Sequence, residues 1–142
     1  VRHAEKEVSA EHPKDPALTP CGEERAQSIA HFFSDVELDA IYSTNYVRTQ
    51  RTAQPTSESK KLEVRSYDPS KLEEFAKQLI SQKQDALVVG HSNTTPEMVN
   101  RLIGEDRFFG LDDTDNGSLF IVTLVGSESS VVRLHFNCNC PE

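Results

Sequence analysis

Two histidines and two arginines carry most of the chemistry that this sequence offers. Arg2 and His3 stand at the start of the chain, Arg48 falls on the first turn of a predicted helix, and His91 follows an apolar run. A neutral imidazole can attack phosphorus and form a covalent phosphohistidine. Planar guanidinium groups meet phosphate oxygens with paired donors, and a second imidazole can donate a further hydrogen bond. These residue types suit phosphoryl transfer, which depends on positioning and on neutralising the charge of the oxygens.

Each of these residues follows a segment that reads as a strand. Val1 has the character of the last residue of a strand, 38–43 reads as a strand before the arginine-bearing helix, and 86–89 is continuously apolar. A short, wholly apolar run is typical of a central parallel strand that is covered on both faces. Ligands of such sheets bind beyond the carboxyl ends of the strands, often at helix N-termini. We therefore expect the four side chains to converge at one edge of a sheet.

The remaining patterns predict helices that alternate with strands. Apolar residues at helical spacing predict helices over 20–34, 72–80 and 95–103, and 45–58 suits a further helix although it lacks a clean apolar stripe. Alternation or apolar runs predict strands at 38–43, 62–65, 86–89, 118–125 and 130–136. Thr19-Pro20 predicts a helix start, and Ser70 to Glu73 has the form of a capping box. The order predicts an α/β fold, a three-layer sandwich whose mainly parallel sheet has helices on both faces, with a C-terminal antiparallel hairpin.

Length and charge limit the classes of function. The 142 residues suit one domain over 1–142, and 15 Lys and Arg against 23 Asp and Glu give a net charge of −8. An acidic balance disfavours a nucleic-acid partner, and no apolar run is long enough to span a bilayer. A small anionic substrate in a locally basic pocket remains compatible with this net charge. We expect the natural N-terminus to lie before Val1, so the sequence indicates neither a cytoplasmic nor an exported location.

The cysteines and the acidic loop do not predict a metal or cofactor. Cys21, Cys138 and Cys140 are too few for a disulfide scaffold, and one C-x-C pair without a second pair or a His cluster is weak support for zinc. Free thiols or one long-range disulfide are both possible. Residues 112–117 resemble the start of a calcium loop, but the twelfth position is Thr123 rather than the bidentate Glu.

Four segments resemble motifs of a known family, in that family's order. Val1 to Lys6 resembles the Arg-His-Gly/Ala signature of the histidine phosphatase superfamily, also called phosphoglycerate mutase-like. Leu18 to Gly22 resembles its Leu-Thr-x-x-Gly helix opening, Tyr42 to Ala53 its Ser-x-x-x-Arg-Ala-x-x-Thr-Ala segment, and Val88 to His91 its second-histidine motif. The resemblance covers almost the whole chain.

The resemblance implies roles for individual residues. His3 would be the nucleophile, while Arg2, Arg48 and His91 would bind and stabilise the transferring phosphoryl group, with Ser92 as a further phosphate contact. It implies a metal-independent phosphatase of a phosphomonoester or phosphohistidine, with a small phosphoester or a phosphoprotein as substrate. Insertions of the size found in the family's mutases are missing, which argues against a sugar-phosphate mutase.

The chain departs from the family's pattern at several positions. Lys6 stands where mutases and many broad phosphatases have Ser or Thr, and the family's first strand would need residues before Val1. Many members place an acidic proton donor in the loop after the third strand, where this chain offers Asp68. Asp68 precedes Pro69, a context that also favours a simple turn residue. Glu5 is a second candidate, although it could equally orient Arg2 or Lys6.

Two other functions compete with this interpretation. Residues 90–94 resemble a nucleophile elbow, so Ser92, an acid within 112–115 and His135 could form a hydrolase triad. Thr94 occupies the position at which that elbow requires Gly, and His135 falls inside a predicted strand. The second alternative is a phosphoester-binding pseudo-phosphatase, against which the complete set of two histidines and two arginines argues.

Overall fold

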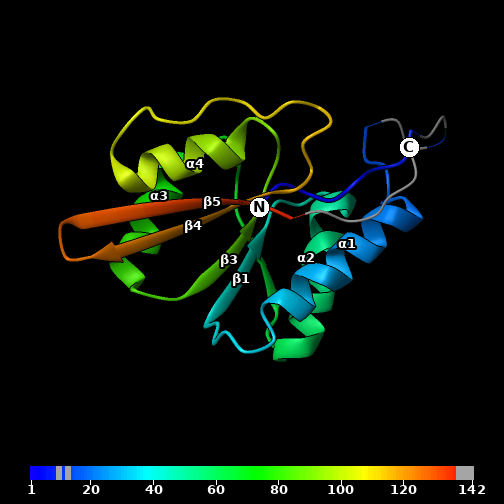
Figure 1. Ribbon diagram of the computed structural model, residues 1–142, viewed down its shortest axis with the longest axis horizontal. Coiled ribbons are helices and arrows are strands. Elements are labelled where there is room, and N and C mark those ends of the chain that lie inside the picture. The colour runs from blue at the N-terminus through cyan, green and yellow to red at the C-terminus, as the bar shows by residue number, and fades with distance from the viewer. Residues whose placement is uncertain (9–10, 12–13, 137–142) are drawn as a thin grey trace.

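The structure, a computed structural model, describes residues 1–8, 11 and 14–136. Within them the elements follow the order α1 (Pro20–Phe32), β1 (Ala40–Ser43), α2 (Val47–Lys60), β2 (Val64–Ser66), α3 (Leu72–Gln82), β3 (Ala86–Val89), α4 (Thr94–Ile103), β4 (Ser118–Val125) and β5 (Glu128–His135). Helices alternate with strands before a closing antiparallel hairpin, as Figure 1 shows. The predicted α/β class is confirmed.

The parallel sheet has β1 at its centre. β1 pairs in parallel with β2 on one side and with β3 on the other, with Ile41 opposite both Val64 and Leu87. The first residues of the chain continue the sheet beyond β3, through a parallel bridge between Arg2 and Gly90. The carboxyl ends of β1 and β3 and the segment that carries Arg2 therefore meet at one edge of the sheet.

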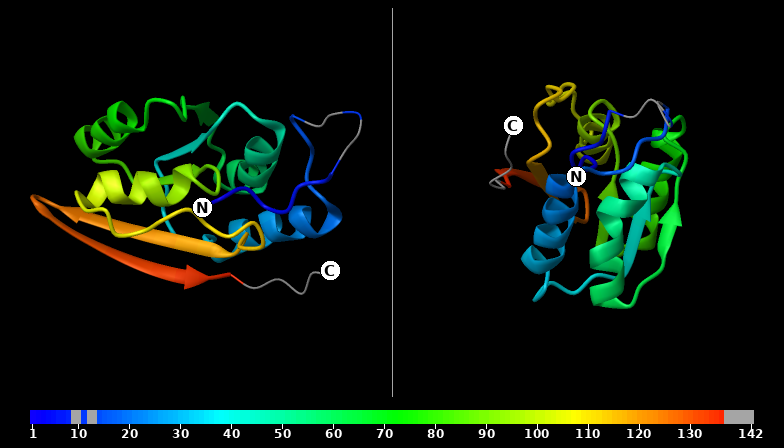
Figure 2. Two further views of the ribbon diagram at one scale, coloured as in Figure 1. Left: turned by 90° about the horizontal axis from the view of Figure 1, so that it is seen from above. Right: turned by 90° about the vertical axis from the view of Figure 1, so that its right-hand side faces the viewer.

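Helices cover both faces of this sheet, as the end-on view in Figure 2 shows. Tyr42 of β1 packs with Phe75 of α3 and Met98 of α4, whereas Ile41 points to the opposite face and packs with Ala53 of α2. Alternate β1 side chains therefore enter two separate cores. Burying a large apolar side chain contributes about 1.5–3 kcal/mol, so these two cores hold the helices against the sheet.

Local sequence explains how α1 begins and how α4 ends. The Thr19 hydroxyl accepts a hydrogen bond of 3.0 Å from the backbone N–H of Gly22, and Pro20 takes the first helical position. Gly104 ends α4 in a left-handed conformation with φ of +72°. The helix start predicted at Thr19-Pro20 is confirmed.

The capping box predicted for α3 is wrong. The N-cap residue is Lys71, with no side-chain hydrogen bond, and the helix starts at Leu72. Ser70 instead turns back to Asp68, whose carboxylate accepts hydrogen bonds from the backbone N–H of Ser70 at 2.9 Å and from its hydroxyl at 2.7 Å. An Asx turn satisfies the same serine locally and competes with the cap.

The closing hairpin has a shorter turn than the predicted one. Val125 pairs with Glu128, so two residues form the turn instead of four, and β5 starts at 128 rather than 130. Gly126 adopts φ of +61°, which a residue with a side chain rarely adopts. The hairpin packs beside α4. The ring of Phe120 on β4 also lies 5.1 Å from that of Phe108, in the loop that follows α4.

Cys21, the second residue of α1, is disulfide-bonded. Its thiol is therefore not free, which favours the long-range disulfide that the sequence left open. Cys138 and Cys140 lie outside the described residues.

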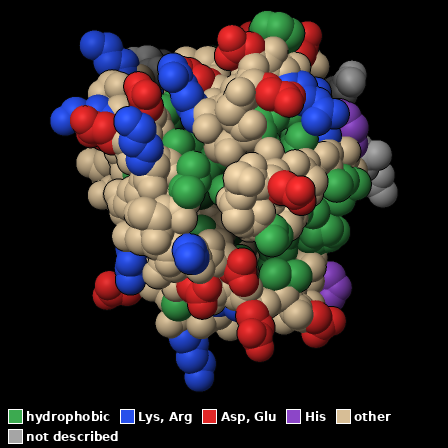
Figure 3. Space-filling model, turned by 90° about the vertical axis from the view of Figure 1, so that its left-hand side faces the viewer, with side chains coloured by type: hydrophobic (Ala, Val, Ile, Leu, Met, Phe, Trp, Pro, Cys, Tyr) green, Lys and Arg blue, Asp and Glu red, His purple; other side chains and the backbone are tan. Residues whose placement is uncertain are grey.

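No helix of the described residues is long and apolar enough to cross a membrane. On the face in Figure 3, Lys and Arg side chains are interspersed with Asp and Glu side chains and form no continuous basic patch.

Candidate active site

The four residues singled out in the sequence lie together at the carboxyl edge of the sheet. The ring centroids of His3 and His91 are 5.7 Å apart, and Nη2 of Arg48 lies 3.5 Å from Nδ1 of His91. The positive charge of Arg2 also acts on both imidazoles and lowers the pKa of each. Residues from three segments that are distant in the sequence thus form one basic site.

His3 is held as a neutral imidazole with one free nitrogen. It is 3% exposed, its backbone N–H donates to the Gly90 carbonyl at 2.9 Å, and its Nδ1 donates to the Ala4 carbonyl at 2.8 Å. Burial above all, followed by the charges of Arg2 and Arg48, lowers the pKa of His3 to about 4. Because the proton is on Nδ1, Nε2 carries the lone pair at neutral pH.

His91 is oriented by a chain of hydroxyl groups. Its Nε2 lies 2.8 Å from Oγ1 of Thr44, which in turn lies 2.8 Å from Oγ1 of Thr49. An arginine N–H can only donate, so Nδ1 of His91 accepts from Arg48 and the proton on Nε2 is donated to Thr44. Burial, and then the charges of Arg48 and Arg2, lower the pKa of His91 to about 4.

The two arginines keep unpaired donors in the site. Nε and Nη1 of Arg48 and Nε of Arg2 are buried, and no described residue accepts a hydrogen bond from them. The Arg48 guanidinium lies over the ring of Tyr46, with Cζ 4.6 Å from the centroid. Buried polar groups almost always have partners, and guanidinium groups pair with phosphate in fixed geometry. The site is therefore built to receive an anion with several oxygens.

Arg2 is held in place by main-chain oxygens. It is 6% exposed, and its Nη1 donates to the carbonyls of Asp112, Asp113 and Asp115 at 3.0, 3.2 and 3.0 Å. Burial lowers the pKa of Arg2, and the nearby carboxylates of Asp113, Asp115 and Glu5 oppose that shift. The loop that resembled a calcium site thus binds a guanidinium through its carbonyls. The described residues contain no group of three or more side chains suited to hold a metal ion.

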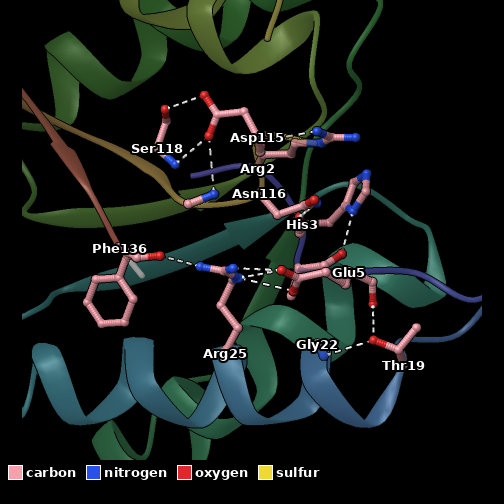
Figure 4. A network of polar contacts seen from close by, with 12 residues as sticks. Arg2, His3, Glu5, Thr19, Gly22, Arg25, Asp115, Asn116, Ser118 and Phe136 are labelled. Atoms are coloured by element: carbon pink, nitrogen blue, oxygen red, sulfur yellow. Dashed lines mark hydrogen bonds and ion pairs between the residues drawn. The ribbon is translucent and has the colours of Figure 1, made fainter. Parts of the chain in front are cut away.

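Side chains of the same loop anchor it to the hairpin and to His3, as Figure 4 shows. The Asp115 carboxylate accepts hydrogen bonds from the Ser118 hydroxyl at 2.7 Å and from Nη2 of Arg133 at 3.1 Å. Nδ2 of Asn116 donates to the His3 carbonyl at 3.2 Å. The start of β4 therefore fixes the backbone around the nucleophile candidate.

Glu5 is paired with Arg25 of α1, and not with Arg2 or Lys6 as the sequence suggested. Nε and Nη2 of Arg25 donate to its carboxylate at 2.6–3.0 Å, and Nη1 donates to the Phe136 carbonyl (Figure 4). Burial alone would raise the pKa of Glu5, but the hydrogen bonds from Arg25 bring it below its usual value. Glu5 is therefore ionised at neutral pH and unsuited to donate a proton.

The site geometry coincides with a family match. The model of the histidine phosphatase superfamily (branch 1) matches residues 1–75, a segment that includes Arg2, His3 and Arg48. This chain belongs to the histidine phosphatase superfamily. No curated protein matches it significantly.

Solved structures of other proteins share the superfamily's fold. The alpha-ribazole phosphatase from Shigella flexneri superposes with a TM-score of 0.77 at 16% identity, over 99% of this chain and 98% of its own. The protein histidine phosphatase SixA complexed with tungstate superposes with a TM-score of 0.74 at 15% identity, over 95% of this chain and 94% of its own. A phosphoserine phosphatase mutant from Entamoeba histolytica superposes with a TM-score of 0.67 at 16% identity, over 92% of this chain and 91% of its own. At these identities the likeness shows the fold, here phosphoglycerate mutase-like.

Asp68, the superfamily-based candidate for the proton donor, lies two residues after β2. Its carboxylate is exposed and engaged by Ser70, and those hydrogen bonds lower its pKa below the usual value. No hydrogen bond or ion pair among the described residues joins it to His3 or His91. The structure thus gives Asp68 the geometry of a turn residue.

Ser92 is partly buried beside His91, and its carbonyl accepts a hydrogen bond of 2.8 Å from the N–H of Leu111. No described residue hydrogen-bonds its hydroxyl, so it is free to contact a ligand. His135, the third member of the alternative triad, is exposed on β5 and has no contact with Ser92 among the described residues. The geometry does not assemble a serine hydrolase.

Sequence reasoning missed Thr44 and Asn116 as supports of the two imidazoles. Thr44 occupies the position of the Ser in the Ser-x-x-x-Arg motif, a signal that could have identified it. Asn116 had no such signal, because its contact to the His3 carbonyl spans 113 residues.

Proposed function

We propose that this chain is a metal-independent phosphatase that works through a covalent phosphohistidine on His3. One observation carries the proposal: a neutral His3, with its lone pair on Nε2, lies in a site where Arg2 and Arg48 keep buried donors without partners. A nucleophile must be unprotonated, and the transferring phosphoryl group needs its oxygens neutralised. The site combines both requirements.

In the first step, Nε2 of His3 attacks phosphorus in line. The N–P bond forms as the bond from phosphorus to the leaving group breaks, and the leaving group departs with the electron pair. Arg2 and Arg48 balance the charge on the phosphoryl oxygens. The hydrogen bond from Nδ1 of His3 to the Ala4 carbonyl stabilises the positive charge that the imidazole gains.

His91 would bind the phosphoryl group as a donor. A phosphate dianion beside it raises its pKa, so we expect His91 to take up a proton on Nδ1 and donate it to a phosphoryl oxygen. Thr44 continues to accept from Nε2 and holds the ring in that orientation. The hydroxyl of Ser92 offers one further contact.

In the second step, water attacks the phosphohistidine on the side that the leaving group has vacated. The N–P bond breaks, its electron pair returns to Nε2 of His3, and inorganic phosphate leaves. A neutral imidazole is restored for the next cycle. No part of this cycle requires a metal, and we expect turnover to persist in EDTA.

Substrates with good leaving groups fit this site best. Glu5 is ionised in its pair with Arg25, and Asp68 is held in a turn with a lowered pKa, so neither is suited to protonate a leaving group. An alkoxide needs a proton as the bond breaks, whereas a phenolate or an imidazole leaves with less help. We infer that the substrate is an aryl phosphomonoester or a phosphohistidine, presented by a small molecule or a phosphoprotein.

The test is to trap the intermediate during turnover of p-nitrophenyl phosphate. Labelled substrate should leave an acid-labile, base-stable adduct on His3, and His3→Ala should lower turnover by more than about 10³-fold. His31→Ala, at an exposed position of α1, is the matched control and should retain activity. Full turnover in His3→Ala would refute the mechanism, and phosphate binding without turnover in the wild type would indicate a pseudo-phosphatase.

A second experiment addresses the proton donor. We expect Asp68→Asn to leave the ratio of aryl to alkyl phosphoester turnover unchanged, because its carboxylate bonds only to Ser70 among the described residues. A selective loss of alkyl phosphoester turnover would restore Asp68 as the general acid.

A further inference from the structure

Tyr46 lies at the phosphoryl site and has no part in the mechanism above. Its ring contacts the imidazole of His91, with centroids 5.1 Å apart at 85°, and its face is covered by the Arg48 guanidinium at 4.6 Å. The residue is nevertheless 37% exposed. An aromatic ring that touches two proposed phosphate ligands and remains open to solvent forms part of the entrance to the site.

Tyr46 contacts the site through His91 and Arg48. Ring contacts join His3 to His91 and His91 to Tyr46, but none among the described residues joins His3 to Tyr46. In-line attack sends the leaving group away from Nε2 of His3 and out of the phosphoryl site. The exposed part of the Tyr46 ring, beside His91 and Arg48, is available to contact it there.

The backbone around Tyr46 is fixed before any ligand arrives. The Tyr46 carbonyl accepts hydrogen bonds from the N–H of Gln50 and the hydroxyl of Thr49, each at 3.0 Å. The next N–H, of Val47, donates to the carboxylate of Asp15 at 2.8 Å. With its main chain held and one face against Arg48, the ring loses little conformational entropy when a ligand packs on it.

We propose that Tyr46 is a specificity-determining residue that selects substrates with a planar leaving group, an aryl or imidazole ring, by packing its exposed ring against it. The proposal rests on the function proposed above, since it takes His3 as the nucleophile. Aromatic pairs gain from offset or edge-on packing beyond the area they bury. A saturated ring of the same size lacks that gain.

The experiment measures binding without chemistry, using phosphonates whose C–P bond is not cleaved. Benzylphosphonate and cyclohexylmethylphosphonate carry six-membered rings of which the first is planar and aromatic and the second saturated, and inorganic phosphate reports on the phosphoryl site alone. We expect the wild type to bind the benzyl compound tighter by a factor of about 2 to 12, the range of one aromatic pair. Tyr46→Leu should reduce that ratio to about 1, whatever its effect on phosphate binding through Arg48, and Tyr46→Phe should keep it.

Phe32→Leu is the matched control, because Phe32 is a partly exposed aromatic residue on α1 whose ring contacts are with Phe33 and Phe136. It should keep the wild-type ratio. A wild-type ratio of about 1, a preference that survives Tyr46→Leu, or equal weakening of phosphate and both phosphonates would overturn the role of Tyr46. A wild type that neither binds phosphate nor turns over p-nitrophenyl phosphate would instead refute the proposed function, and with it this inference.

Discussion

Replacing Arg48 by Met should make the ligand-free protein more stable and nearly inactive. Arg48 is partly buried, and two of its nitrogens have no partner among the described residues. Among the described residues, its guanidinium is held by a weak 3.5 Å hydrogen bond to His91 and by its position over the Tyr46 ring. Methionine keeps much of the apolar volume and removes the unpaired donors.

The magnitude follows from these contacts. Each buried donor without a partner costs about 1–3 kcal/mol, so removing two gains about 2–6 kcal/mol. Loss of the cation–π contact with Tyr46 offsets about 1 kcal/mol of this gain. The net gain for Arg48→Met is therefore about 1–5 kcal/mol in the free energy of unfolding, and each kcal/mol raises Tm by roughly 3–5 °C.

The assay is urea unfolding in phosphate-free buffer and again with phosphate, alongside turnover of p-nitrophenyl phosphate. Phosphate should stabilise the wild type by mass action and leave Arg48→Met unaffected, while turnover falls by about 10²-fold or more. Arg51→Met is the control on the same helix, since Arg51 is exposed and lies 3.9 Å from Glu23; it should change stability by less than about 0.5 kcal/mol. The reasoning is refuted if Arg48→Met unfolds at lower urea than the wild type without phosphate.

Three further predictions concern the groups around the two imidazoles. The pKa values of His3 and His91, about 4 in the fold against 6.5 when unfolded, mean that the unfolded chain binds more protons between these limits. The contribution of these histidines to the free energy of unfolding should therefore be full above pH 6.5 and fall toward pH 4, by about 1.4 kcal/mol per pH unit for each histidine. NMR titrations of His3 and His91 that give pKa values near 6.5 would contradict this. Thr44→Val should lower turnover by about 10-fold to 10²-fold and alter the ¹⁵N signature of the His91 tautomer, with rescue by Thr44→Ser; unchanged spectra would remove its positioning role. Glu5→Gln should lower the free energy of unfolding by about 2–3 kcal/mol in urea, because it leaves the charge of Arg25 buried, and a neutral result would contradict the importance of this pair.

The convergence of the four central residues could be predicted because the signals are local. Arg2, His3 and His91 directly follow strand-like residues, and Arg48 opens a helix after another strand. In a parallel sheet the carboxyl ends of neighbouring strands share an edge, so strand order in the sequence is enough to bring them together. The same local patterns predicted the α/β class.

The supports of the site could not be predicted in the same way. Arg25 meets Glu5 across 20 residues, and Asn116 meets the His3 carbonyl across 113, without any spacing rule that links them. Arg2 is held by hydrogen bonds to backbone carbonyls. Because every residue has a backbone carbonyl, the side-chain types in the sequence do not predict these hydrogen bonds. Such contacts depend on tertiary packing.

The way Arg2 is held explains how an acidic chain can keep a basic site. A carboxylate pair, like that of Arg25 with Glu5, would occupy its guanidinium and cancel its charge. Carbonyl oxygens hold Nη1 in place without a formal negative charge, and Nε remains unpaired among the described residues. The carboxylates of Asp112 and Asp115 are engaged elsewhere, with Thr114 and with Ser118 and Arg133. The loop therefore positions Arg2 through its main chain and leaves its Nε unpaired among the described residues, as the proposed binding of phosphoryl oxygens requires.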